Sequence, residues 1–284
     1  MTMRHLQSCV LENRELSGDL SLLRLHVPGL GDAQPGQFIH LTCGGDLTLP
    51  RPFSILDIQP VEQTVDLLYR VVGEGTRRMR GWQRGQEAPL LGPIGRPFTR
   101  PPVGSKAVLV AGGVGVAPLD FFARRLVAQG VEVVLLWGIE SESPWPLVAD
   151  PARGGVPEGL AVAHLQQAGV VSRLASLTER PGYFCGYVTE LVTEYLQASP
   201  SAERGRLQLY TCGPLPMMGA LAQVAERLAI GGEASLEAQM ACGFGVCMGC
   251  ALLIQDGGAG YYRRVCVDGP VFSLAEVDWR QAGG

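Results

Sequence analysis

Short runs in which hydrophobic and polar residues alternate fill the first third of the chain. The clearest runs are LSLLRLHV (20–27), QFIHLTC (37–43), FSILDI (53–58) and TVDLLYRVV (64–72), and segments rich in Pro and Gly separate them. Short, evenly spaced strands with such punctuation are typical of a small closed sheet. We therefore expect residues 1–101 to form an antiparallel β-barrel domain.

The pattern changes after this segment, because continuous apolar runs now alternate with helical ones. Such alternation predicts parallel βαβ units with helices on both faces of the sheet. We expect an α/β domain over residues 102–230 and a smaller unit over residues 231–284. The expected strands are AVLVAGG (107–113), VEVVLLWG (131–138) and LQLYTCG (207–213), and the expected helices are FFARRLVAQG (121–130), YVTELVTEYLQ (187–197) and LPMMGALAQVAERLAI (215–230).

Composition narrows the possible partners of the chain. Its 284 residues are 46% hydrophobic and 18% charged, and the formal net charge is −4. No long run of Lys or Arg offers a footprint for a phosphate backbone, so we expect no nucleic-acid partner. No apolar run reaches the ~18 residues of a membrane span, and the N-terminus does not resemble a secretory signal. We expect a cytoplasmic protein without a membrane anchor.

Four of the eight cysteines lie close together near the end of the chain, in the spacing C-x4-C-x2-C-x15-C. They are Cys242, Cys247, Cys250 and Cys266. The first three follow plant-type ferredoxin spacing, in which four thiolates hold a 2Fe-2S cluster. Glycines between them leave room for a tight loop whose N–H groups point at the sulfurs. A four-cysteine zinc site is the main alternative, although such sites usually show two CxxC pairs, and free thiols are another.

Two motifs in the barrel segment are suited to bind a pyrophosphate. RPFS places the guanidinium of Arg51 three residues before the hydroxyl of Ser54, and a guanidinium can hold phosphate oxygens in a bidentate manner. YRVVGEGT follows, where glycines leave an approachable backbone and Thr76 offers a hydroxyl donor. Each motif alone is also compatible with an ordinary turn in a β domain. Together, ahead of an α/β domain, they favour a dinucleotide site.

The α/β segment carries a second nucleotide signal, AGGVGVAPL at 111–119. It follows an expected strand and opens a helix, so its N–H groups and the helix dipole favour a pyrophosphate. It does not match G-x-G-x-x-G, and a tight strand-to-helix turn is the alternative. TCGPLPMM (211–218) lies at the next strand-to-helix junction, where Cys212 is a candidate to reach a nicotinamide ring. Glu140 and Glu142 would repel a 2′-phosphate, which favours NADH over NADPH.

Taken in order, RPFS, YRVVGEGT, LGPIG, GGVGVAPL, TCGPLPMM and the cysteine set resemble the ferredoxin reductase-like superfamily. With the cluster segment at its C-terminal end, the chain resembles in particular the iron-sulfur electron-transfer subunits of dihydroorotate dehydrogenase B. The resemblance covers nearly the whole chain and implies a FAD-binding barrel, an NAD-binding α/β domain and a 2Fe-2S domain. The residues that it implicates are, for FAD, Arg51, Pro52, Phe53, Ser54, Leu68, Tyr69, Arg70, Gly75 and Thr76, for NAD, Gly112, Gly113, Gly115, Pro118, Cys212, Gly213 and Pro214, and for the cluster, Cys242, Cys247, Cys250 and Cys266.

The resemblance also implies a function. Electrons would pass from a partner catalytic subunit that contains FMN and oxidises dihydroorotate, through the cluster and FAD, to NAD+ in pyrimidine biosynthesis. The assembly would be a heterotetramer with two copies of each subunit, and no catalytic base for dihydroorotate is expected in this chain. Relatives that serve ferredoxin, sulfur or hydrogenase systems leave a reductase subunit for another acceptor as the alternative. A zinc-stapled binding module on a degenerate reductase fold is a third hypothesis. Some of those relatives carry Asp as the first cluster ligand, whereas this chain carries Cys242.

Overall fold

The computed structural model describes residues 3–280 except 18–19, 46, 153–154 and 257–258. Its internal contacts group the chain into two compact units. The first contains residues 1–98 and 236–271, and the second contains residues 99–235 and 272–284. The division expected at 101/102 and 230/231 was drawn from the change in hydrophobic pattern along the chain, and it stays a prediction.

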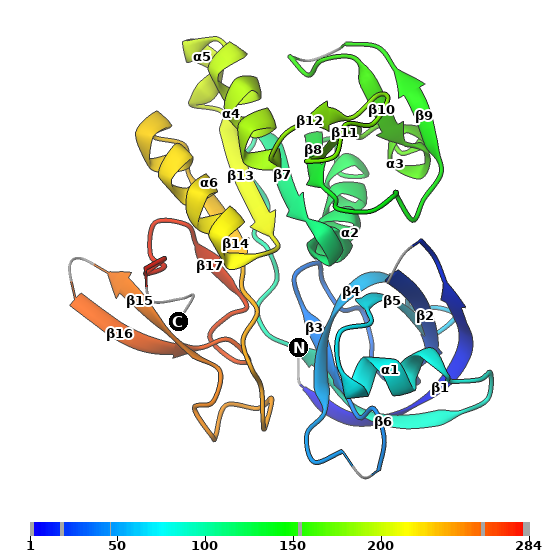
Figure 1. Cartoon of the computed structure of the whole chain (residues 1–284). Coiled ribbons are helices and arrows are strands. Elements are labelled where there is room, and N and C mark those ends of the chain that lie inside the picture. The colour runs from blue at the N-terminus through cyan, green and yellow to red at the C-terminus, as the bar shows by residue number, and fades with distance from the viewer. Residues whose placement is uncertain (1–2, 18–19, 46, 153–154, 257–258, 281–284) are drawn as a thin grey trace. The chain divides into compact units, whose positions relative to one another are not determined.

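The N-terminal part of the first unit is a closed antiparallel barrel with strand order β1-β2-β5-β4-β3-β6 (Figure 1). Period-2 alternation places one set of side chains inside, where Leu23, Ile39 and Leu67 are completely buried. One short helix, α1 (Glu74–Arg80), connects the last two strands. The predicted barrel is confirmed. Its strands are β1 (Arg4–Glu15), β2 (Leu20–His26), β3 (Phe38–Leu41), β4 (Arg51–Gln59), β5 (Thr64–Arg70) and β6 (Glu87–Ile94).

The C-terminal part of the first unit consists of a glycine-rich loop and a two-stranded antiparallel sheet, β15 (Ala251–Asp256) and β16 (Ala259–Arg264). It is joined to the barrel by backbone contacts. The Arg96 N–H donates to the Gly269 carbonyl at 2.6 Å, and Arg96 forms a parallel bridge with Pro270. Gly95 has a φ of +85°, and a Cβ there would overlap Pro270. A larger residue at position 95 would therefore push the two parts of this unit apart.

The second unit is built on a seven-stranded sheet with order β12-β11-β8-β7-β13-β14-β17. The pairs from β12 to β14 are parallel, as the alternation of apolar strands and helices predicted. β14 follows residue 230 and extends this sheet by pairing with β13. The strands are β7 (Lys106–Gly112), β8 (Glu132–Gly138), β11 (Val171–Ser176), β12 (Phe184–Cys185), β13 (Leu207–Cys212), β14 (Gly232–Ser235) and β17 (Val271–Ser273).

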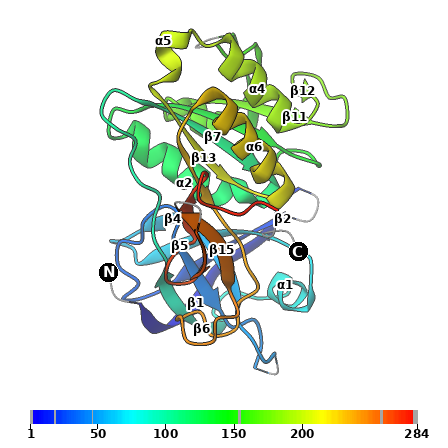
Figure 2. The same ribbon diagram turned by 90° about the vertical axis from the view of Figure 1, so that its left-hand side faces the viewer.

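Helices cover both faces of this sheet (Figure 2). On one face α2 (Val116–Val127) packs against β7 and β8 and contacts α3 (Ala163–Gln167), while α4 (Val188–Ala198) and α6 (Leu215–Leu228) pack together on the other. The helices predicted over 121–130, 187–197 and 215–230 correspond to α2, α4 and α6. The remaining elements are the turn of 3-10 helix η1 (Gly113–Gly115), α5 (Ser201–Arg204) and a separate hairpin of β9 (Leu147–Asp150) and β10 (Gly159–Val162). In the part of the chain that the structure describes, no helix has the length and apolarity needed to cross a membrane.

A buried ion pair ties β11 to the end of β9. Arg173 and Asp150 have side chains that are each 3% exposed, and the Arg173 Nη1 donates to Asp150 Oδ2 at 2.6 Å. The same guanidinium donates to the carbonyls of Pro157 and Pro151. Its charge and its hydrogen-bond donors are therefore satisfied inside the protein rather than by water.

We predict that Arg173→Met lowers the free energy of unfolding by about 3–5 kcal/mol, because it leaves the Asp150 carboxylate buried without its cation. Urea unfolding of the purified chain, followed by circular dichroism, measures the change. The matched control is Glu132→Gln, since Glu132 is 74% exposed and pairs with Lys106 at the surface. That variant should cost about 1 kcal/mol or less. Equal effects of the two variants would contradict the prediction.

Candidate functional site

The cysteine loop and the β15–β16 hairpin bring the four clustered cysteines together. Cys250 directly precedes β15 and Cys266 follows β16, and the Val265 N–H donates to the Cys250 carbonyl at 3.0 Å. The antiparallel register thereby places the Cys250 and Cys266 sulfurs 3.3 Å apart, although sixteen positions separate them in sequence. Both side chains are almost completely buried.

Backbone N–H groups of the loop point at the thiols. Burial opposes ionisation of Cys242, but hydrogen bonds from the N–H groups of Cys247, Phe244 and Val246 outweigh it and lower the pKa of its thiol to about 6. The Gly249 N–H lies 3.4 Å from the Cys247 sulfur. Burial and the neighbouring Cys250 raise the pKa of Cys266 to about 12, against the effect of the Gly245 N–H. Because a cluster ligand is a thiolate, the loop N–H groups favour the charge state that iron requires.

The thiols approach one another as two pairs, Cys242 with Cys247 and Cys250 with Cys266. A 2Fe-2S cluster takes two protein ligands on each of its irons, so paired thiols suit it. Among the described residues, no group of three or more His, Cys, Asp or Glu side chains is gathered as for one metal ion. The donor set and the N–H groups around it fit a two-iron cluster.

Positive φ angles shape the loop between the ligands. Gly243 has a φ of +75° and Gly245 has a φ of +88°. Residues other than glycine rarely adopt this left-handed backbone conformation. These two positions therefore require glycine for their backbone conformation, while the predicted room for an inorganic core stays a prediction. Arg264, which the sequence did not single out, donates to the Gly245 carbonyl at 2.7 Å and to Asp268 Oδ2 at 3.2 Å. It holds the loop over the hairpin.

The RPFS and Gly-Thr motifs meet at one end of the barrel. Gly75 lies so close to Arg51 that an added Cβ would be 3.4 Å from the Arg51 Cγ. Thr76 opens α1, where its hydroxyl accepts from the Gly73 N–H at 3.1 Å and donates to the Gly73 carbonyl. The Thr76 hydroxyl, which we expected to donate to a phosphate, is therefore hydrogen-bonded to the backbone at the N-terminus of α1. Arg51 donates to the Leu49 and Pro50 carbonyls.

Three of the other residues that the resemblance implicates for FAD have buried side chains. Phe53, Leu68 and Tyr69 are 8%, 3% and 1% exposed. The Tyr69 hydroxyl donates to Asn13 Oδ1 at 3.0 Å, and its ring meets Phe53 edge-on. Phe53 and Tyr69 point into the barrel, on the side of Ile39 and Leu67, whereas Leu68 alternates with them and points to the other side of the sheet. Arg70 ends β5 with a half-buried side chain.

The pairing of β3 with β4 defines a second set of residues. His40 is opposite Pro52 and Phe38 is opposite Ser54, so these four side chains point to one side of the strand pair, which we call the outer face. The completely buried Ile39 and Leu41 point the other way, into the barrel. The cysteine loop reaches the outer face, because a Cβ on Gly243 would lie 2.6 Å from the His40 Nδ1. The RPFS motif, which we call the flavin motif because the resemblance assigns it to FAD, therefore shares one surface with the cysteine loop.

In the second unit the two strand-to-helix loops pack backbone against backbone. A Cβ on Gly115 would overlap the Cys212 carbonyl, and one on Gly213 would lie 2.9 Å from the Gly112 Cα. Gly112 itself faces Pro214 and Met217. The glycines are therefore needed for the close approach of the two loops, a role that we did not predict from the sequence. Pro118 lies in the first turn of α2, as predicted.

Trp137 fixes the position of the glycine loop and was not identified from the sequence. It is completely buried in β8, and its indole N–H donates to the Gly113 carbonyl at 2.9 Å. Cys212 is 1% exposed at the end of β13, so its sulfur does not lie open on the surface of this loop pair. Glu140 and Glu142 lie in the exposed segment after β8.

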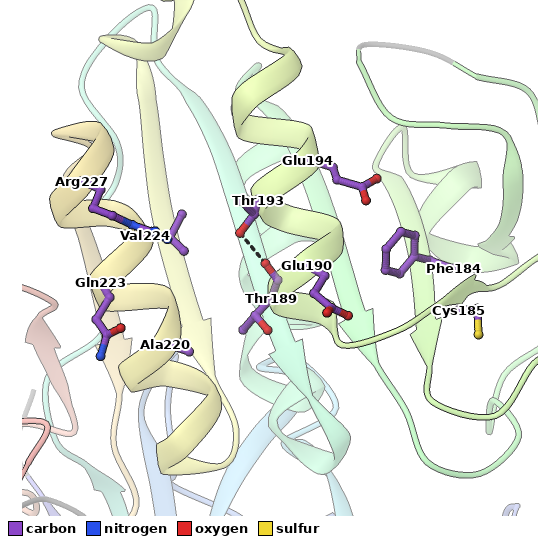
Figure 3. Close-up of a pocket in the computed structure, with 10 residues that line it drawn as sticks. All are labelled: Phe184, Cys185, Thr189, Glu190, Thr193, Glu194, Ala220, Gln223, Val224 and Arg227. Atoms are coloured by element: carbon purple, nitrogen blue, oxygen red, sulfur yellow. Dashed lines mark hydrogen bonds between the residues drawn. The ribbon is translucent and has the colours of Figure 1, made fainter.

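A shallow groove of about 590 Å³ lies between α4, α6 and β12 in the second unit (Figure 3). Its lining is mixed, with Glu190 and Glu194 from α4 and Arg227 from α6. None of the residues predicted for FAD, NAD or the cluster lines it. The groove therefore does not coincide with the residues predicted to bind cofactors, which lie in the cysteine loop, in the barrel motifs and in the two glycine-containing strand-to-helix loops.

Comparison with known protein families agrees with this geometry. Residues 237–278 match the iron-sulfur cluster binding domain of dihydroorotate dehydrogenase B, and residues 109–223 match the oxidoreductase NAD-binding domain. The solved structure of an NADH-dependent reduced ferredoxin-NADP oxidoreductase superposes with a TM-score of 0.78 at 23% identity, covering 96% of this chain and 90% of that chain. At that identity it supports the fold alone.

Two curated relatives carry the same description, "Dihydroorotate dehydrogenase B (NAD(+)), electron transfer subunit". The protein from Shouchella clausii is 36% identical over 86% of this chain and 86% of its own length. The protein from Caldanaerobacter subterraneus subsp. tengcongensis is 32% identical over 94% of this chain and 96% of its own length. The chain belongs to the family of electron transfer subunits of dihydroorotate dehydrogenase B (NAD(+)).

Proposed function

We propose that this chain carries electrons from a catalytic dihydroorotate dehydrogenase subunit that contains FMN to NAD+, by way of a 2Fe-2S cluster and FAD. FAD, when bound, exchanges two electrons as hydride with nicotinamide and single electrons with an iron-sulfur cluster. The residues of the chain bind, orient and space these groups. Oxidation of dihydroorotate is assigned to the partner, and no residue of this chain is proposed as a base for it.

The first unit would hold the two electron carriers. Cys242, Cys247, Cys250 and Cys266 would ligate the cluster, with the loop N–H groups stabilising their thiolate charge. On the barrel, the Arg51 guanidinium beside Gly75 would bind the FAD pyrophosphate, and Ser54 on the outer face would meet the flavin ring. Pro52 and Thr76 complete the two motifs, while Phe53, Leu68, Tyr69 and Arg70 would shape the site through their backbone or packing.

The second unit would bind NAD at the paired loops. The N–H groups at the start of α2, after Gly112, Gly113 and Gly115, would receive the pyrophosphate, and Pro118 has no N–H to lose there. Gly213 and Pro214, which pack against Gly112, would form the second wall of the site, with the buried Cys212 next to them. The exposed carboxylates of Glu140 and Glu142 favour NAD over a 2′-phosphorylated nucleotide.

The partner would dock over the cysteine loop. Phe244, Val246 and Met248 are 53%, 75% and 49% exposed, and they lie in the chain between the first three cysteines of the set. Exposed apolar side chains around a redox centre suit a partner that must bring its own flavin close. We propose a cytoplasmic heterotetramer with two copies of each subunit.

The observation that carries this proposal is the meeting of the cysteine loop and the flavin motif on the outer face of β3 and β4. It is tested by co-expressing the chain with a candidate FMN-containing catalytic subunit and measuring dihydroorotate-dependent reduction of NAD+. Turnover that requires both subunits supports the proposal. If the loaded chain oxidises NADH but supports no orotate formation with that partner, a reductase subunit for ferredoxin, sulfur or hydrogenase systems takes its place.

We predict that Gly115→Ala lowers kcat/KM for NADH by at least about tenfold, since its methyl group overlaps the Cys212 carbonyl and separates the two NAD loops. FAD and iron contents should stay at wild-type values, because both groups are held by the first unit. Stopped-flow reduction of the flavin by NADH measures the effect. Gly219→Ala in α6 is the control, because a Cβ there is 3.6 Å from Trp279 and fits. A normal rate in Gly115→Ala would refute the role of the loop pair.

We predict that Met248→Glu weakens binding of the catalytic subunit by roughly tenfold or more, because a carboxylate would be desolvated in an apolar interface. Analytical ultracentrifugation of the two purified subunits measures the affinity. Val61→Glu is the control, since Val61 is 91% exposed on the barrel and away from the cysteine loop in sequence. Iron content is checked in both variants. Unchanged binding by a fully loaded Met248→Glu protein would rule out docking at this loop.

A further inference from the structure

A buried histidine lies between the cysteine loop and the flavin motif. His40 is in β3, is 2% exposed and is paired with Pro52 across the outer face. On its other side is the loop, since a Cβ on Gly243 would be 2.6 Å from the His40 Nδ1. The imidazole ring of His40 therefore lies against Gly243, the residue after Cys242. It projects from the strand pair that also carries Ser54.

Core packing alone does not explain a histidine at this position. Its Nε2 is buried without a hydrogen-bond partner among the described residues, which is unfavourable for folding. Burial lowers the pKa of the ring below its ordinary value of 6.5, the Pro50 carbonyl opposes this effect, and the positive charge of Arg51 adds to it. The ring is therefore neutral near neutral pH, and leucine would fill a similar volume without the cost.

We propose that His40 is a positioning residue, whose imidazole seats the cysteine loop on the outer face of β3 and β4 and so sets the spacing between cluster and flavin. The inference rests on the proposed function, because it takes the cluster and FAD to be held by the residues named above. It adds a residue that none of the motifs contains.

The chain offers a matched pair of glycines for testing this contact. Gly243 has a φ of +75° and faces His40, whereas Gly245 has a φ of +88° and faces Val267, with an added Cβ 2.9 Å from the Val267 Cγ1. Alanine at either position strains the backbone in the same way. Only the alanine methyl group at position 243 would also clash with the His40 imidazole and so push the loop away from the outer face.

The experiment is a pair of double-mutant cycles on the full chain loaded with FAD and cluster. It combines His40→Ala with Gly243→Ala and, separately, with Gly245→Ala. The readouts are iron and sulfide per chain, the visible circular dichroism of the cluster, and its rate of reduction after mixing with NADH. We expect each single variant to slow that reduction by about tenfold.

The two cycles should differ in additivity. Gly243→Ala should slow the His40→Ala protein by clearly less than it slows wild type, because the backbone strain remains but the clash with the imidazole is gone, while Gly245→Ala and His40→Ala should multiply in their effects. Multiplicative effects in both cycles would overturn the inference.

His40→Leu separates positioning from folding and covers the case in which a glycine variant fails to fold. We expect the apoprotein of this variant to unfold at the same or a higher urea concentration than wild type, and the loaded protein to reduce its cluster about tenfold more slowly. A less stable apoprotein with wild-type reduction rate would make His40 an ordinary core residue and overturn the inference. If the wild-type chain itself holds no cluster or is not reduced by NADH, the proposed function fails first, and the inference fails with it.

Discussion

The proposed electron transfer depends on one electrostatic requirement, the stabilisation of the thiolates that would hold the cluster in the cysteine loop and at the end of the hairpin. Thiolates lose solvation when they are brought together, and backbone N–H groups are the donors that replace water without adding bulk. The chain provides these donors by bending the loop through positive φ at Gly243 and Gly245, and the lowered pKa of Cys242 is the direct consequence. The hairpin that follows then supplies the second pair of sulfurs from residues distant in sequence.

Glycine serves a related purpose wherever two parts of the chain must approach closely. Gly95 makes room for Pro270, and Gly115 makes room for the Cys212 carbonyl. The first contact attaches the cysteine segment to the barrel, and the second locks the two loops proposed to bind NAD. Glycines in motifs that resemble cofactor-binding loops thus also allow two segments of the chain to pack closely.

Much of this was predictable from local patterns. Period-2 alternation indicated the barrel, the βα alternation indicated the parallel sheet, and C-x4-C-x2-C-x15-C indicated the cluster site, because each signal is contained within a short stretch of chain. What remained hidden depends on contacts between distant segments. Trp137 donates to Gly113 from the neighbouring strand, twenty-four positions further along the chain, and His40 meets Gly243 from about two hundred positions away. The helix α1 was also missed, since its start was interpreted as a phosphate loop, and β14 extends the sheet beyond residue 230.

Anaerobic reduction of the isolated chain by NADH, followed by electron paramagnetic resonance and metal analysis, tests the central claim most directly. The account predicts about two irons per chain and a reduced 2Fe-2S signal that grows as the flavin absorbance is bleached. A colourless protein with a single zinc ion, or a flavin that is bleached by NADH while the cluster stays oxidised at equilibrium with excess NADH, would contradict it.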